Sequence, residues 1–187
     1  MNRKIIIVSE KFIDRALLLL CLCLIISSCQ SRDENLKLSS IKMEITTLDT
    51  EIIRAEMEDG KYAGGLVKAL IRSRIEILKQ TREMLQQRDK AWTFGIKLRY
   101  TIDGKPFVLS DSAKQLLPDV ERELSDLKSK IAKQELIVAQ YSGGLVQALS
   151  IATLETMRQT YAMLDQRRLA IKYELPQYLG FQNKPEN

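Results

Sequence analysis

Apolar residues recur at spacings of three and four along two separate segments of the chain, a period typical of one face of an α-helix. The two segments share the same heptad register, and each precedes a pair of glycines. The seam positions are Leu38, Ile41, Ile45, Leu48, Ile52 and Ala55 in the first segment, and Leu117, Val120, Leu124, Leu127, Ile131 and Gln134 in the second. Each set can pack as a narrow seam against another helix.

The segments that begin just before the two glycine pairs are copies of one another. Residues 62–91 and 141–170 agree at 15 of 30 positions without a gap, at an offset of 79 residues. Their apolar positions again have helical spacing: Ile71, Ile75, Leu78 and Leu85 in the first copy, and Ser150, Leu154, Met157 and Leu164 in the second. We interpret the repeat as the duplication of one structural unit.

The glycine pairs Gly64-Gly65 and Gly143-Gly144 interrupt this helical pattern. The apolar stripe changes phase across each pair, and two adjacent glycines inside a helix cost roughly 2 kcal/mol relative to alanines. We therefore predict a chain reversal at each pair, so that each copy forms an antiparallel helical hairpin. One long helix through each glycine pair is the alternative.

Between the two copies the apolar period changes to two, which is typical of a β-strand. The alternating residues are Trp92, Phe94, Ile96, Leu98, Tyr100 and Ile102. Asp103-Gly104 then marks a turn before the apolar residues 107–109. The pattern predicts a β-hairpin over residues 92–110, with its Trp92, Phe94 and Leu98 face packed on the helices.

The predicted fold is therefore mainly α, with two antiparallel αα-hairpins joined by a β-hairpin. A four-helix bundle would bury the seams, and an elongated pair of hairpins that completes its core by self-association is the alternative. Pro118 suits the first turn of the third helix, although a start near Ser110 with a kink at Pro118 also fits. We expect Pro176 to end the last helix.

The first 28 residues have the organisation of an export signal. Arg3 and Lys4 open it, and the uncharged apolar stretch 16–26 is shorter than the about 20 residues of a spanning helix. The sequence Ile26-Ser27-Ser28-Cys29 then resembles the lipobox of bacterial lipoproteins. The resemblance implies cleavage before Cys29 and acyl chains on that cysteine, which anchor the chain to a membrane.

The resemblance covers only the signal, and the repeat sets the expected organisation of the rest of the chain. A signal peptide over 1–28 precedes one helical domain over 29–187, which comprises repeat 1 (29–91), the β-hairpin (92–110), repeat 2 (111–172) and a C-terminal tail (173–187). Gln30 stands where aspartate would favour retention in the inner membrane. We expect an outer-membrane lipoprotein that faces the periplasm if the host is Gram-negative.

Composition narrows the chemistry. The chain contains no histidine, and its three cysteines are Cys21 and Cys23 in the signal and Cys29 at the lipid, so the usual nucleophile, base and zinc-ligand sets are missing from the mature chain. Removal of the signal takes four basic and two acidic residues from 29 and 24, which leaves a net charge of +3. We expect no enzyme activity, no cofactor, no metal and no nucleic-acid partner.

One polar helix stripe is the candidate interaction surface, because its residues are identical in both copies. The stripe consists of Glu76, Gln80, Gln87 and Arg88 in the first copy, and of Glu155, Gln159, Gln166 and Arg167 in the second. Two equivalent stripes can form a pseudo-symmetric partner site. Alternatively, they form hydrogen bonds between the two hairpins and fix their register.

These patterns favour a lipid-anchored, non-enzymatic helical scaffold or adaptor that binds other envelope proteins or associates with itself. The alternative function is a lipoprotein that holds a small apolar ligand or a lipid within its helical bundle.

Overall fold

The computed structural model describes residues 36–102 and 104–176, so the export signal and Cys29 lie outside the described residues. The chain divides into two compact units, Met1–Ile41 and Lys42–Asn187. In the first unit, the described residues 36–41 are helical.

Four long helices dominate the structure, which confirms the prediction of a mainly helical fold. The first helix covers residues 36–59, of which 42–59 belong to the second unit. The other helices are α2 (Gly65–Thr93), the short α3 (Asp111–Gln115), α4 (Leu117–Ala139) and α5 (Gly144–Tyr173). Among the described residues, no helix combines the length and the apolar character needed to cross a membrane.

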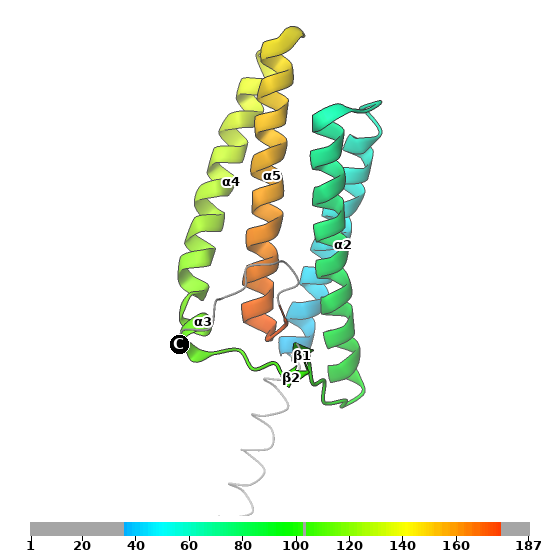
Figure 1. Ribbon diagram of the computed structural model, residues 1–187, viewed down its shortest axis with the longest axis vertical. Coiled ribbons are helices and arrows are strands. Elements are labelled where there is room, and N and C mark those ends of the chain that lie inside the picture. The colour runs from blue at the N-terminus through cyan, green and yellow to red at the C-terminus, as the bar shows by residue number, and fades with distance from the viewer. Residues whose placement is uncertain (1–35, 103, 177–187) are drawn as a thin grey trace, which may run out of the picture. The chain divides into compact units, whose positions relative to one another are not determined.

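Helix α5 lies between α4 and α2 and packs along both (Figure 1). The first helix runs beside α2, and Arg82 of α2 reaches back to Asp49 across 3.1 Å. The packing is compatible with a helical bundle. The residue of the second copy that is equivalent to Arg82 is Tyr161, which packs against apolar residues of α4 instead of forming an ion pair.

The chain reverses direction at both glycine pairs, between the first helix and α2 and between α4 and α5. In each turn, the side chain six residues after the tyrosine donates a hydrogen bond to the tyrosine carbonyl oxygen. Lys68 Nζ donates to the carbonyl oxygen of Tyr62 at 2.6 Å, and Gln147 Nε2 donates to that of Tyr141 at 2.6 Å. The two turns therefore share one local geometry.

The predicted seams are buried to different degrees in the two hairpins. Leu48, Ile52 and Ala55 of the first helix are at most 4% exposed. In α4 only Val120 and Leu124 are buried, and they form a cluster with Ile171 of α5. The seam of the second hairpin is therefore less buried than that of the first, because Leu127, Ile131 and Gln134 are only half-buried.

The crossover has much less strand pairing than the β-hairpin that we predicted over residues 92–110, and a hairpin of that extent is not shown. Helix α2 continues to Thr93, and Phe94, which was expected to pack on the helices, is 73% exposed. Strand pairing is limited to β1 (Thr101–Ile102) and β2 (Lys105–Pro106). The alternating pattern was misread because its first residues, Trp92 included, also fit the helical face of α2.

Both predicted starts of the third helix are used, one by the short α3 and the other by α4. Ser110 caps the short helix α3 by accepting a hydrogen bond from the amide of Ala113 at 3.2 Å. A break at Leu116 follows, and Pro118 then lies in the first turn of α4, where its missing amide hydrogen costs nothing. Helix α5 ends at Tyr173, three residues before Pro176.

The turn geometry predicts that the two glycines of a pair differ in their tolerance of a side chain. Gly65 has φ +86° and Gly144 has φ +82°, whereas Gly64 has an extended φ of −179°. A Cβ atom added at any of the three meets nothing within 4 Å, so only the backbone conformation matters. We expect Gly65→Ala and Gly144→Ala each to lower the free energy of unfolding by about 1 kcal/mol.

Urea denaturation followed by circular dichroism measures this effect, with Gly64→Ala as the control. The control substitution should leave the midpoint unchanged or raise it slightly, because alanine restricts the unfolded chain. An equal loss at Gly64 and Gly65 would show that the left-handed conformation is not the reason for the glycine.

Candidate functional site

The two copies of the candidate stripe occupy different environments. We call Glu76, Gln80 and Gln87 the α2 stripe, and Glu155, Gln159 and Gln166 the α5 stripe. All three members of the α2 stripe are exposed. In the α5 stripe, Glu155 is 3% exposed and Gln166 is 4% exposed. The sequence identity of the stripes therefore does not extend to their surroundings.

The α5 stripe forms the polar part of the contact between the hairpins. Gln159 Nε2 donates to Ser73 Oγ of α2 at 2.9 Å. Two turns further along, Gln166 Nε2 donates to Thr81 Oγ1 at 3.0 Å, and both groups are buried. These bonds correspond to the register-fixing alternative, but for one copy of the stripe only.

The arginines that follow the stripes also differ. Arg88 donates from Nε and Nη2 to the carbonyl oxygen of Tyr173 at 3.0 and 2.7 Å, and so satisfies the C-terminal end of α5. Its guanidinium group lies 5.4 Å from the ring centre of Trp92, which in turn contacts the ring of Tyr173 edge-on. Arg167 is exposed. Arg88 therefore has a structural role where α5 ends.

An ion network that sequence reasoning missed joins all four long helices. Its members are Glu58 of the first helix, Arg74 of α2, Glu135 of α4, and Glu155 and Arg158 of α5. Arg158 Nη1 contacts Glu58 at 2.9 Å and Glu155 at 2.8 Å, while its Nη2 contacts Glu135 at 2.6 Å. Arg74 pairs with Glu58 and lies 3.4 Å from Glu155.

The carboxylates of this network raise the pKa of its central arginine. Burial by itself lowers the pKa of Arg158, but the hydrogen bond to Glu135 and the charges of Glu58 and Glu155 outweigh it and raise that pKa. Burial and the same two carboxylates raise the pKa of the nearby Tyr62 hydroxyl. Arg158 therefore stays charged and links its three carboxylates through ion pairs.

Part of the network repeats within each hairpin. Arg158 pairs with Glu135 across α4 and α5, and the equivalent residues 79 positions earlier, Lys79 and Glu56, pair at 2.8 Å. Aligning the repeat upstream of Tyr62 would have found this pair from sequence, since the spacing of 23 residues is the same. The contacts that Arg158 makes with Glu58 and Glu155 have no such signal.

A second ionic contact joins the first helix to α5 near the other end of the bundle. Arg168 binds Glu44 through two nitrogens at 3.1 and 3.0 Å, and Lys172 binds the same carboxylate at 3.0 Å. Burial alone would raise the pKa of Glu44, but the hydrogen bonds from these two cations hold it below its ordinary value. The first helix is thus fixed to α5 at two levels.

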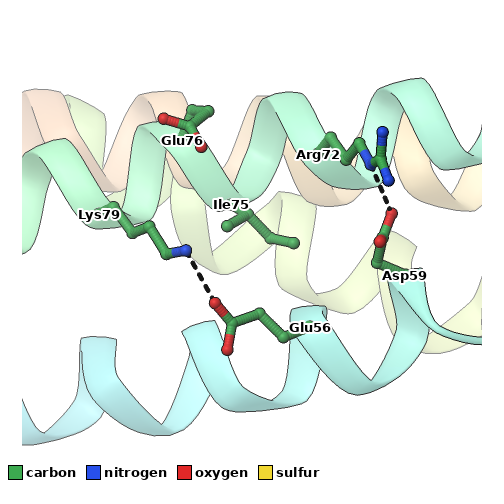
Figure 2. Close-up of a pocket in the computed structure, with 6 residues that line it drawn as sticks. All are labelled: Glu56, Asp59, Arg72, Ile75, Glu76 and Lys79. Atoms are coloured by element: carbon green, nitrogen blue, oxygen red, sulfur yellow. Dashed lines mark hydrogen bonds and ion pairs between the residues drawn. The ribbon is translucent and has the colours of Figure 1, made fainter.

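A shallow hollow of about 300 Å³ adjoins the α2 stripe. Figure 2 shows Lys79 reaching Glu56 and Arg72 reaching Asp59 across it, while Glu76 points away from both pairs. A second hollow of about 380 Å³ lies between the same two helices, near Lys42 and Lys90. Both are open to solvent and lined largely by polar side chains, so the apolar ligand within the bundle stays a prediction.

The acidic groups at these positions are committed to basic partners. Each carboxylate of the ion network contacts an arginine, and Glu56 and Asp59 contact Lys79 and Arg72. Within residues 36–102 and 104–176, no group of three or more acidic or cysteine side chains is arranged to hold a metal ion. The arrangement is suited to fixing helices and to presenting a polar helix face.

Because Gln87 is exposed and Gln166 is buried, their substitution should affect the free energy of unfolding differently. Gln166→Ala removes a buried hydrogen bond and leaves a small cavity, so it should lower the free energy of unfolding by about 2 kcal/mol. Gln87→Ala changes an exposed side chain and should alter that free energy by less than about 0.5 kcal/mol. Thermal and urea denaturation of the two variants measure the difference. Equal losses would show that the two glutamines have equivalent environments after all.

Comparison with known proteins adds no assignment to this geometry. No protein-family model matches the chain, and neither a curated protein nor a solved structure gives a significant match. The side-chain contacts described above are therefore the basis of the functional argument.

Proposed function

We propose that this chain is a lipid-anchored protein of the cell envelope, held at a membrane through Cys29, that acts as a non-enzymatic adaptor for another envelope protein. The α2 stripe is the surface that binds the partner. The sequence around Cys29 supports the anchor, and the exposed position of the α2 stripe supports the adaptor role.

The observation that carries the proposal is that the α5 stripe already binds a helix. Its Glu155, Gln159 and Gln166 face Arg74, Ser73 and Thr81 of α2. The α2 stripe carries the same three residue types at the same spacing, but they are exposed. It therefore offers a second surface with the same chemistry, and it fits a partner helix with hydroxyl and basic side chains.

The rigidity of α2 strengthens this interpretation. Arg74 and Thr81 of α2 contact α5, and Lys79 and Arg82 contact the first helix. Because the helix is held on two sides, its backbone loses little further freedom when the stripe binds a partner, and the cost of ordering falls on the side chains alone.

We also infer that the two helical hairpins arose by duplication of one unit. The repeated turn contact to the tyrosine carbonyl and the repeated pair Glu56–Lys79 and Glu135–Arg158 support this origin. After duplication, one stripe served the contact between the hairpins and the other remained at the surface.

Chemical crosslinking of the full-length protein in cells, followed by purification and mass spectrometry, tests the adaptor role. We expect one or two defined envelope proteins, which are lost with Cys29→Ser. The double variant Gln80→Arg with Gln87→Arg places two charges on the stripe and should reduce capture about tenfold, the effect of losing about 1.4 kcal/mol of binding free energy.

The matched control places the same charges on α4, with Ser125→Arg and Ala132→Arg, which are also exposed and seven residues apart. The control variant should capture the partner as the unchanged protein does. Equal capture by the stripe variant would contradict the α2 stripe as the binding surface. Recovery of this chain alone would contradict the adaptor role, and undiminished capture with Cys29→Ser would contradict the need for an anchor.

A further inference from the structure

The turn between α4 and α5 exposes an unusual amount of apolar surface. Six large side chains on its two sides are exposed by 39–75%: Leu136, Ile137, Tyr141, Leu145, Val146 and Leu149. They present on the order of 500 Å², which lies toward the upper end of the ~300–600 Å² found for the largest patch on a typical monomer. None of the contacts that fix the two hairpins to each other uses these side chains.

The same turn carries no charged side chain. Residues 136–154, here called the uncharged tip, contain no Asp, Glu, Lys or Arg in nineteen positions. The equivalent segment of the first hairpin, 57–75, carries Glu58, Asp59, Lys61, Lys68, Arg72 and Arg74. Several of these form ion pairs within their own turn, such as Asp59 with Lys68 and with Arg72.

The difference between the two turns concerns their surface and not their shape. Both close through the same side-chain contact to a tyrosine carbonyl. Leu66 and Leu145 occupy equivalent positions and are 67% and 75% exposed. The first turn surrounds its exposed leucine with charges, whereas the second surrounds it with further apolar side chains.

We propose that the uncharged tip binds the uncharged tip of a second copy of this chain. In a two-fold contact each residue near the axis meets its own copy, so a charged residue there would face a like charge. The uncharged tip avoids this repulsion over its whole length. Its six side chains supply more than half of the ~800 Å² per partner that a standard interface buries. This contact is separate from the α2 stripe and does not depend on the adaptor role.

A photo-crosslinking amino acid in the full-length, membrane-anchored chain tests the contact. Incorporation of p-benzoylphenylalanine in place of Leu145 should give a product of twice the chain mass that contains only peptides of this chain. Incorporation in place of Leu66 is the matched control, because the position is equivalent and similarly exposed. It should give about tenfold less of that product.

A second pair of variants tests the role of charge. With the crosslinker at residue 145, Leu149→Glu should reduce the dimer product about tenfold, because it places like charges opposite one another. Leu66→Glu, on the first turn, should leave the product unchanged. Circular dichroism establishes that both variants keep their helix content.

Four outcomes would overturn the proposal: equal dimer product at residues 66 and 145, no effect of Leu149→Glu, an adduct at 145 with a different protein, or an adduct with lipid alone. The adaptor role is judged separately by capture of another envelope protein through the α2 stripe. A dimer without such a partner therefore contradicts the adaptor role only, and a partner without a dimer contradicts this inference only.

Discussion

The guanidinium group of Arg158 determines how the two hairpins meet. It is 20% exposed and contacts one carboxylate on the first helix, one on α4 and one on its own helix. Buried ions must be matched by opposite charges at close range, so this arginine favours the rotation and the axial position of α5 that bring it within reach of Glu58 and Glu135. That choice turns the α5 stripe inward toward α2 and leaves the α2 stripe at the surface. The proposal that the α2 stripe binds a partner depends on this asymmetry.

The helices and their turns could be predicted from sequence because local rules specify them. The heptad spacing, the phase change at Gly64-Gly65 and the 79-residue repeat all concern residues close together in the chain or in the alignment of its copies. The extent of the β-hairpin was overpredicted because a short alternation is ambiguous, and the antiparallel pairing is limited to two residues on each strand. Trp92 lies in α2, where Arg88 and Tyr173 contact it, and the exposed Phe94 has no packing partner to stabilise a strand.

The candidate stripe shows what a repeat in sequence cannot determine. Identity between Gln87 and Gln166 indicated equivalent roles, yet one is exposed and the other is buried against Thr81. Two copies in one chain need not have equivalent surroundings. Here α5 presents its stripe to α2, whereas α2 contacts α5 through other residues and leaves its own stripe exposed. The ion network escaped sequence reasoning for the same reason, since Glu58 and Arg158 are 100 residues apart. The two copies differ chemically at positions such as 58 and 137, where glutamate in the first copy corresponds to isoleucine in the second.

The most direct test of this account is the free energy of unfolding of Arg158→Met compared with that of Lys79→Met. Both residues form the ion pair that repeats in each hairpin, but only Arg158 also joins the two hairpins. We expect a loss of about 3 kcal/mol for Arg158→Met, because it leaves two largely buried carboxylates, Glu58 and Glu155, to share the single cation Arg74. Lys79→Met should cost clearly less, because the Lys79–Glu56 pair is at the surface. Equal losses at the two positions would contradict the claim that Arg158 fixes the arrangement of the hairpins.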